Sequence, residues 1–441
     1  MKSLLVKPEY SALRGEIKIP GDKSITHRAI MLSSLVEGTT LIKGASLALD
    51  CLNTLKAFNA LGIETKRDEE SLVVHGKGLY GLGEPEDIID VGNSGTTMRL
   101  ILGILAAQDF YAVLTGDESL RKRPMRRVIE PLQKMGASLF GRANGNYPPI
   151  TVKGNPALRP ISYHTKLPSA QVKSAILLAG LFARGETSVT ESMLSRDHTE
   201  RMLRYLGVNL ERDGLKVIIQ GPSYLKGREV ISVAGDISSA SFLIVLATLV
   251  PGSSLWLRDV GINPTRTGII DVLRKMGGNI KIVGIREECG EPIADIYVEE
   301  SRLRGVSIGN EEIPRLIDEI PIIAVASCFA DGVTKITGAS ELRVKETDRI
   351  SAIVSSLRKM GADISELKDG MIIQGGRPIK GGEVESFGDH RTAMSLVIAG
   401  LLAKGETKVS DVDCIDTSFP GFVETINSIL DIPSIKLVED K

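Results

Sequence analysis

The pentapeptide Leu-Arg-Lys-Met-Gly at 357–361 carries a repeat that runs along the whole 441-residue chain. Its copies are LKAFNALG at 55–62, LQKMG at 132–136, LRYLG at 203–207, LRKMGG at 273–278 and a degenerate NSILDIPSIKLVED at 427–440. Each glycine follows Leu or Met residues at helical spacing and precedes a β-rich stretch, which predicts that it ends a helix and leads into a strand. The glycine spacings of 74, 71, 70 and 84 residues indicate six units, since 441 divided by six is 73.5.

A second set of turns, rich in Gly, Ser, Thr and Asp, recurs in phase with these glycines and opens an apolar helix each time. The turns begin near residues 21, 92, 167, 235, 317 and 388, with GDKSITHRAI, GNSGTTMRLI, LPSAQVKSAI, GDISSASFLI, IDEIPIIAVA and FGDHRTAMSL. The surrounding pattern predicts an α/β unit of strand, helix, strand, helix, strand and strand. Six copies favour a closed or doubled globular assembly over a solenoid, and the simplest division is three copies on each side of residues 234–235.

Composition excludes several classes of protein. With 54 Lys and Arg against 55 Asp and Glu, the net charge is −1, which gives no overall attraction to nucleic acid or to an anionic membrane. The longest apolar runs, at 175–183 and 242–250, are far shorter than the roughly 20 residues of a membrane-spanning helix. The first residues resemble neither a secretory signal nor a transit peptide, so we expect a cytoplasmic protein. Four cysteines and five histidines without metal-ligand spacing predict no metal site.

The predicted helix starts carry long cations. Lys23 and Arg28 follow Gly21-Asp22, and Arg391 follows Gly388-Asp389-His390. Helix N-termini bind anions through their unsatisfied N–H groups and partial positive charge, so a cation there is unfavourable unless an anion is present. For the short residues, such as Ser24 and Ser169, helix capping is the alternative. For the cations, the alternative is a solvated charge.

A second helix is predicted to start at RKRPMRR, 121–127, which holds five cations in seven residues. Without interleaved aromatic residues or net positive charge, a nucleic-acid patch is disfavoured. A small, multiply anionic substrate is the preferred interpretation. Candidate acid and base groups are Asp318, just before an apolar helix, and Glu346, between Lys345 and Arg349. The flanking cations would keep Glu346 ionised unless burial opposes them.

These motifs together resemble the 5-enolpyruvylshikimate-3-phosphate synthase (3-phosphoshikimate 1-carboxyvinyltransferase) family, in its class II branch, from Gly15 to about Phe422. They occur in the family's order as GDKSITHRA, GNSGTTMR, RPMRR, SAQVK, SRDHTE, NPTR, DEIPI, ELRVKETDR, DHRTAM and TSFP. The resemblance implies two similar domains of three βαβαββ repeats, with the active site in the interdomain cleft. One domain would combine residues 1–20 with 235–441, and the other would be 21–234.

The resemblance also implies a reaction. The carboxyvinyl group of phosphoenolpyruvate would pass to the 5-hydroxyl of 3-phosphoshikimate by addition and elimination, releasing phosphate without metal or organic cofactor. This is a step of the shikimate pathway toward chorismate and aromatic amino acids. No nucleic acid or membrane partner is implied, and we expect a monomer.

The site residues that the resemblance implies are carried over position by position. Asp318 would be the proton acceptor, Glu346 the donor to the methylene carbon, and Lys23 a residue that touches both substrates. The 3-phosphoshikimate site would comprise Lys23, Ser24, Arg28, Ser169, Ala170, Gln171, Arg196, Asp318 and Lys345. The phosphoenolpyruvate site would comprise Lys23, Gly95, Arg123, Gln171, Arg349 and Arg391, with Asn93 nearby.

Four positions bear on the inhibitor glyphosate, for which the family is a target. Thr417, Glu341 and Leu100 stand where class I members carry Lys, Asn and Pro. Gly95 stands where some class II members carry Ala, whose methyl crowds glyphosate, so Gly95 is predicted to leave room for it, although the other changes could cancel this. The rival interpretations are a transferase acting on UDP-N-acetylglucosamine, disfavoured because 115–125 lacks a cysteine, and a non-catalytic anion- or nucleic-acid-binding module.

Overall fold

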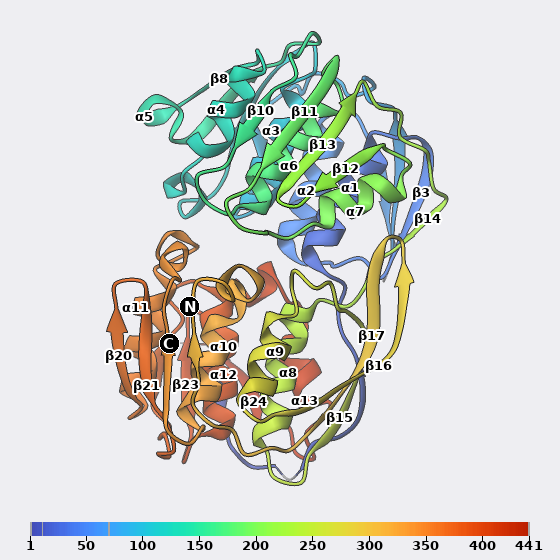
Figure 1. Ribbon diagram of the computed structural model, residues 1–441. Coiled ribbons are helices and arrows are strands. Elements are labelled where there is room, and N and C mark those ends of the chain that lie inside the picture. Colours follow the sequence, from blue (N-terminus) through green and yellow to red (C-terminus); the bar gives the residue numbers. More distant parts are fainter. Residues whose placement is uncertain (1, 11, 69–70, 440–441) are drawn as a thin grey trace. The chain divides into compact units, whose positions relative to one another are not determined.

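The computed structural model describes residues 2–10, 12–68 and 71–439. Within these limits the chain forms two compact units (Figure 1). The first unit takes 1–20, 235–286 and 292–441, and the second takes 21–234 and 287–291.

Three four-stranded sheets occur in the described part of each unit, and all six sheets share one strand arrangement. The first strand of a βαβαββ copy pairs in parallel with the second, the second pairs antiparallel with the fourth, and the third lies at the far edge. In the sheet β6-β7-β9-β8, for example, Ile89 is opposite Leu114, and Tyr111 is opposite Lys153. The predicted order of strands and helices is therefore confirmed.

The strands of the second unit, in sheet order, are β14 (Val230–Ser232), β3 (Glu37–Lys43), β5 (Ser71–Lys77) and β4 (Glu64–Arg67); β6 (Ile89–Asp90), β7 (Tyr111–Thr115), β9 (Tyr147–Lys153) and β8 (Ser138–Gly141); β10 (Ser162–His164), β11 (Gly185–Thr190), β13 (Lys216–Gly221) and β12 (Leu210–Asp213).

The strands of the first unit, in sheet order, are β2 (Arg14–Lys18), β15 (Ser254–Gly261), β17 (Glu291–Glu299) and β16 (Asn279–Glu288); β18 (Ser307–Ile308), β19 (Val333–Ile336), β21 (Gly370–Gln374) and β20 (Asp363–Leu367); β22 (Glu383–Glu385), β23 (Thr407–Ser410), β1 (Lys2–Val6) and β24 (Ile435–Glu439).

Two kinds of helix alternate with these strands. The first helices of the copies are α1 (Lys23–Ser34), α3 (Gly95–Leu105), α6 (Ala170–Gly180), α8 (Ile237–Leu249), α10 (Ile320–Cys328) and α12 (His390–Leu402). The second helices are α2 (Leu49–Ala60), α4 (Arg126–Lys134), α7 (His198–Tyr205), α9 (Gly268–Lys275), α11 (Arg349–Lys359) and α13 (Phe422–Asn427). An additional short helix, α5 (Arg142–Gly145), precedes β9.

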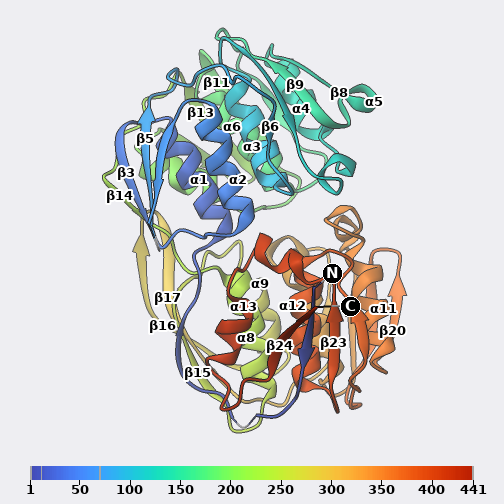
Figure 2. The same cartoon turned by 180° about the vertical axis from the view of Figure 1, so that it is seen from behind.

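The first helices form the core of each unit. All nine residues of α10 are buried, and α8 is buried from Ile237 to Thr248, so these helices are apolar on every side. In the first unit α8, α10 and α12 pack against one another, and in the second unit α3 packs against both α1 and α6 (Figures 1 and 2). A helix without a polar face requires neighbours on all sides, so no single copy could bury its own first helix.

The repeated glycines end the second helices as predicted. The five glycines have φ between +82° and +105°, and each directly follows the C-cap residue of its helix. At Gly361 the backbone N–H donates to Arg358 O at 2.9 Å, and the next N–H, of Ala362, donates to Leu357 O at 3.0 Å. The same pair of bonds follows at the other four glycines, which is the Schellman arrangement for satisfying the last helical carbonyls.

Three strands complete sheets that lie far away in the sequence. β14, at the end of the second unit's long segment, pairs in parallel with β3 near its start. β2 pairs with β15, and β1 lies between β23 and β24, where Figure 2 shows it as a dark blue strand among red ones. In the second unit one sheet therefore combines strands from both ends of the segment 21–234, and in the first unit two sheets each take a strand from the segment 1–20.

One difference concerns residues 287–291. The sequence-based division assigned all of 235–441 to one domain, whereas these five residues group with the second unit. The physical reason lies in their contacts: the Glu291 carboxylate pairs with His198 Nδ1 at 2.7 Å, Gly290 O accepts from Arg201, and Cys289 Sγ accepts from Ser232 N.

No helix among the described residues is both long enough and apolar enough to cross a membrane.

The Schellman turns make a prediction about stability. At Gly361 an added Cβ would meet no atom within 4 Å, but φ is +84°. Gly361→Ala should therefore lower the free energy of unfolding by about 1 kcal/mol through backbone strain alone. Gly382 is the matched control, because its Cβ would also meet open space while its φ lies outside the left-handed region. Urea denaturation of the two alanine variants measures the difference, and an equal effect at both positions would contradict the assignment.

Candidate active site

The starts of the three first helices in each unit are joined by polar side chains. In the first unit Ser238 of α8 donates its hydroxyl to Glu319, just before α10, and Arg349 bridges Asp318 to Asp389, the N-cap of α12. In the second unit Arg28 of α1 donates to Ser174 of α6, and Gln171 of α6 donates to Thr96 of α3 at 3.0 Å. The helix starts that the sequence singled out are thus brought together within each unit.

Arg349 is the centre of the cluster in the first unit. Its guanidinium is buried and contacts three carboxylates: Nε donates to Asp389 Oδ2 at 2.7 Å, Nη1 to Asp318 Oδ1 at 3.0 Å and Nη2 to Glu346 Oε2 at 2.6 Å. Lys345 Nζ adds a second cation to Asp318 at 3.2 Å. The predicted acid and base groups therefore share one cation.

The charge of Arg349 is secured by this arrangement. Burial opposes the charged form, but Asp389, Glu346 and Asp318 together outweigh burial and raise the pKa of Arg349 above its ordinary value. Asp389 also accepts from Thr392 N with its other oxygen, Oδ1, at 2.9 Å, so one carboxylate both caps α12 and orients the guanidinium.

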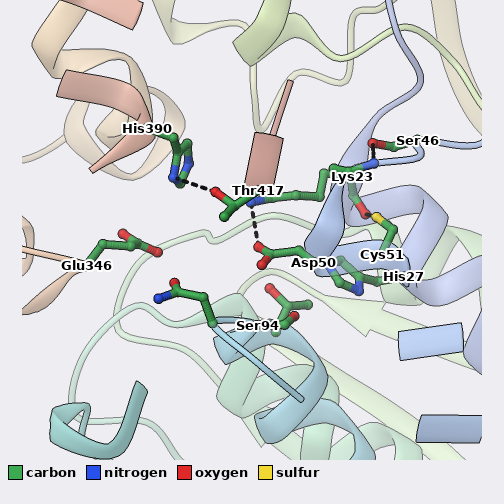
Figure 3. Close-up of polar contacts among 12 residues, drawn as sticks. Lys23, His27, Ser46, Asp50, Cys51, Ser94, Glu346, His390 and Thr417 are labelled. Carbon is green, nitrogen blue, oxygen red and sulfur yellow. Dashed lines mark hydrogen bonds and ion pairs between the residues drawn. The ribbon is translucent and has the colours of Figure 1, made fainter. Parts of the chain in front are cut away.

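Arg391, His390 and Thr417 lie at the same end of the first unit. Arg391 is 5% exposed, and its Nε is buried without a hydrogen-bond acceptor among the described residues. The Thr417 hydroxyl donates to Cys414 O at 2.6 Å and lies 3.3 Å from His390 Nδ1 (Figure 3). Glu341 is part of the short 3₁₀ helix η4 (Ser340–Val344), which leads into Lys345.

In the second unit, Lys23 points toward a carboxylate that the sequence analysis did not name. Its Nζ lies 2.9 Å from Asp50 Oδ2, and both side chains are largely buried (Figure 3). Asp22 caps α1 by accepting from Ile25 N at 2.8 Å, and Ser24 is the second residue of that helix. The cation at this helix start is therefore partly compensated by the protein itself.

Arg28 is held on all sides. Its guanidinium donates to Thr199 Oγ1 at 2.7 Å, to Ser24 O at 2.8 Å and to Ser174 Oγ at 3.1 Å. Burial lowers its pKa to about 10, with the carboxylate of Glu200 acting in the opposite direction. The neighbouring His27 is fully buried, and burial together with Lys23 and Arg28 lowers its pKa well below the ordinary value, so His27 is neutral.

Gly95 begins α3 between two guanidinium groups. An added Cβ would lie 2.9 Å from Arg99 Nη1 and 3.0 Å from Arg123 Cζ. Arg99 donates to Gln171 Oε1 at 2.8 Å, and Arg123 donates to the carbonyl oxygen of Asn93 at 3.2 Å. An alanine at this position would therefore require the ends of both arginine side chains to shift slightly.

The remaining predicted residues of the second unit also lie at helix starts. Ser169 caps α6 by accepting from Val172 N at 3.4 Å, and Ala170 is the first residue of that helix. Arg196 precedes α7 and lies close enough to Arg28 to oppose its charge. The run 121–127 differs from the prediction, because the chain forms a 3₁₀ turn (Leu120–Lys122) that ends before Arg123, and α4 begins only at Arg126.

Sequence reasoning missed three partners. Asp50, Arg99 and Asp389 each hold a predicted site residue, yet none was assigned a role. For Asp389 the signal was present, since an Asp before an apolar helix is a capping residue with a second carboxylate oxygen to spare. Asp50 and Arg99 have no such local signal. Among the described residues, no group of three or more His, Cys, Asp or Glu is placed to hold a metal ion.

The fold and these clusters define a class: an α/β protein of six βαβαββ copies in which buried helices begin among paired cations and carboxylates. Such an arrangement can hold phosphates and carboxylates and can move protons. Comparison with known proteins gives the particular family. A sequence model of the family described as EPSP synthase (3-phosphoshikimate 1-carboxyvinyltransferase) matches residues 8–426. The chain belongs to this family, which confirms the resemblance found in its motifs.

Close relatives cover nearly the whole chain. A 3-phosphoshikimate 1-carboxyvinyltransferase of Geobacter sulfurreducens is 54% identical over 418 residues, 95% of this chain and 97% of the relative. One from Brevibacillus brevis is 54% identical over 417 residues, with the same coverage. The solved structure of an EPSP synthase from Acinetobacter baumannii matches with a TM-score of 0.89 at 42% identity, covering 100% of both chains. The predicted α/β fold class is confirmed.

The Arg349 cluster generates a prediction about stability and pH. Arg349→Met leaves the buried Asp389 and the largely buried Asp318 and Glu346 without their shared cation, so the free energy of unfolding should fall by about 3–5 kcal/mol near pH 8. Without the cation, burial raises the carboxylate pKa values in the folded state above those in the unfolded state. The folded variant then binds more protons, and its deficit should shrink as the pH is lowered from about 8 to about 5.

Urea denaturation at several pH values measures this deficit. The control is Arg302→Met, which removes an exposed pair with Asp331 and should cost at most about 1 kcal/mol at any of these pH values. A deficit for Arg349→Met that grows toward acid pH would contradict the assignment.

Proposed function

We propose that this protein transfers the carboxyvinyl group of phosphoenolpyruvate to the 5-hydroxyl of 3-phosphoshikimate in the shikimate pathway, releasing phosphate. The observation that carries the proposal is the buried Arg349, with Asp318 and Glu346 on neighbouring guanidinium nitrogens at 3.0 and 2.6 Å. This reaction needs one group to accept a proton and another to donate one while a cation holds the anionic substrate, and the cluster supplies all three. Membership of the family supports it further.

The proton transfers follow from the reaction's own balance. In the addition step the 5-hydroxyl oxygen bonds to C2 of phosphoenolpyruvate, the hydroxyl proton leaves, and the C3 methylene takes up a proton. In the elimination step C3 loses a proton and the C2–O bond to phosphate breaks. We assign the hydroxyl proton to Asp318 and the C3 proton to Glu346, and Lys23 to both substrates.

The position of Arg349 supports this division of roles. Nη2 keeps Glu346 charged while no anion competes for the guanidinium. A substrate anion that takes over part of this charge would leave Glu346 better able to hold the proton that it must donate. Asp318 has Lys345 as a second cation, which favours the charged form that accepts a proton.

We propose that the two helix-start clusters bind the two substrates. For 3-phosphoshikimate the residues are Lys23, Ser24, Arg28, Ser169, Ala170, Gln171, Arg196, Asp318 and Lys345. For phosphoenolpyruvate they are Lys23, Gly95, Arg123, Gln171, Arg349 and Arg391. Two observations support the second set: the buried Nε of Arg391, which lacks an acceptor within the described chain, and the space at Gly95 beside Arg123.

Three further points belong to the proposal. The two compact units would act as the two domains of the enzyme, with residues 287–291 grouped as the contacts indicate. The enzyme would work in the cytoplasm and as a monomer. Light scattering during gel filtration, with and without both substrates, tests the last point, and a mass of two chains would contradict it.

The direct test of function measures phosphate release from phosphoenolpyruvate with two acceptors. With 3-phosphoshikimate we expect turnover and formation of the enol ether at the 5-position. With UDP-N-acetylglucosamine at the same concentration we expect no release above the rate without acceptor. Turnover with the nucleotide sugar alone would overturn the proposed substrate and leave the family assignment intact.

The acid and base assignments make a separate prediction. Glu346→Gln and Asp318→Asn keep an oxygen that accepts from Arg349 but remove the titrating carboxyl, so each should lose at least about 100-fold in kcat with the fold retained. Single-turnover rates measure the loss, and circular dichroism checks the fold. Glu366→Gln, an exposed carboxylate on Arg343 in the same unit, is the control and should leave kcat unchanged. Near-normal turnover of either site variant would remove that residue from its role.

A further inference from the structure

Three charged residues of the second unit are completely buried and have no role in the proposed chemistry. Lys173 Nζ lies 2.7 Å from Glu191 Oε2 and 2.7 Å from Glu200 Oε1, and all three side chains are 0–1% exposed. Lys173 comes from the SAQVK motif and Glu200 from SRDHTE, so both motifs contain residues that the predicted substrate contacts left unused. Burying three charges costs free energy of desolvation even when the charges are paired. The elements that the three residues connect therefore indicate their role.

The cluster fixes both ends of one segment. Glu191 directly follows strand β11, and Glu200 lies in the first turn of α7. Between them runs the segment 192–199, which contains Arg196, so one ammonium group holds the two ends. Ser195, next to Arg196, donates its hydroxyl to the other oxygen of Glu191.

The residues beside the cluster hold Arg28. Ser174 follows Lys173 in α6, and Thr199 precedes Glu200 in α7. Their hydroxyls lie 2.6 Å apart, and both accept from the Arg28 guanidinium, Thr199 from Nε at 2.7 Å and Ser174 from Nη2 at 3.1 Å. A shift between α6 and α7 would therefore displace the acceptors of Arg28 together with the segment that contains Arg196.

We propose that Lys173, Glu191 and Glu200 are positioning residues that set the geometry of Arg28 and Arg196 for the phosphate of 3-phosphoshikimate. This inference rests on the proposed function. The three residues do not touch the substrate; they fix α6, the segment 192–199 and α7 to one another. Without the ammonium, the two carboxylates would repel each other and separate the elements that carry the two arginines.

The direction in which the affinity for 3-phosphoshikimate changes tests the proposal. Glu200 is a negative charge near the cations of an anion site, so its field alone weakens the binding of a phosphate. If Glu200 acted only through this field, Glu200→Ala would bind 3-phosphoshikimate more tightly. If Glu200 acts by positioning, the same variant binds more weakly, because α7 is released from Lys173.

The experiment measures the Kd of 3-phosphoshikimate by titration calorimetry on the full chain. For Glu200→Ala and for Lys173→Met we expect a Kd at least about tenfold higher than that of the parent. Glu200→Gln keeps a polar oxygen beside Lys173 Nζ and the length of the side chain, and should restore the Kd to within about threefold. At saturating 3-phosphoshikimate, the apparent KM for phosphoenolpyruvate should stay within about twofold of the parent value in all three variants.

A control variant in the hydrophobic core separates an effect of positioning on the Kd from an effect of lost stability. Leu178→Ala opens a cavity in the same helix, α6, where the side chain is buried, so it should lower the melting temperature without changing the Kd. An unchanged or lower Kd in Glu200→Ala would overturn the proposal, as would a rise in Kd equal to that of Leu178→Ala. If Lys173→Met does not fold, the two Glu200 variants decide the question.

The failure of this inference can be told from a failure of the proposed function. If the parent chain neither binds 3-phosphoshikimate nor releases phosphate with it, the proposed function fails. If the parent is active and the Glu200 variants bind like the parent, the positioning role alone fails.

Discussion

Six helices that are buried along nearly their whole length are the constraint from which the architecture follows. The neighbours of such a helix must cover its whole length, so its charged side chains and unsatisfied N–H groups can meet a ligand only where the helix begins. In each unit three of these helices are linked at their starts by hydrogen bonds or ion pairs, through Arg28 and Gln171 in one and Ser238 and Arg349 in the other. Since the sides of these helices are covered by packing, the polar groups that could bind or react with a ligand lie at the helix starts of each unit.

Cationic side chains at helix starts interact unfavourably with the positive end of the helix dipole, and the protein compensates their charge in two ways. Arg349 is neutralised by three carboxylates, and Lys23 is paired with Asp50. Arg28 instead relies on hydroxyl and carbonyl oxygens, with the carboxylate of Glu200 farther away, and its depressed pKa records the incomplete compensation. At Lys23 the cation of a helix start therefore has an anionic partner within the protein, in addition to any anion that a ligand would bring.

Local patterns predicted most of the fold. The LRKMG glycines are helix-ending residues in all five copies, and the Gly/Ser/Thr/Asp turns precede the six buried helices, because a glycine at positive φ and a capping side chain act within one turn of chain. The local sequence does not predict which sheet each N-terminal strand joins. β1 and β2 lie eight residues apart yet enter different sheets, a choice set by hydrogen-bonding partners hundreds of residues away. For the candidate site, motifs predicted Asp318, Glu346 and Arg349, but only the fold revealed the contacts of Asp50, Arg99 and Lys173.

The two units share a fold but differ in how they distribute charge, and this difference bears on mechanism. In the first unit the carboxylates Asp318, Glu346 and Asp389 surround Arg349, so cations and carboxylates alternate within a few ångströms. In the second unit the guanidinium groups of Arg99 and Arg123, beside Gly95 at the start of α3, donate to amide and carbonyl oxygens, and the carboxylates Glu191 and Glu200 are buried beside Lys173. Alternating charges suit proton transfer, because small changes in pairing shift the proton between groups. Guanidinium groups held in place by protein oxygens suit anion binding, because their field is fixed before the ligand arrives. Under the proposed function, the first unit supplies the two carboxylates that move protons, and the second unit supplies most of the residues that bind the anionic groups of the substrates.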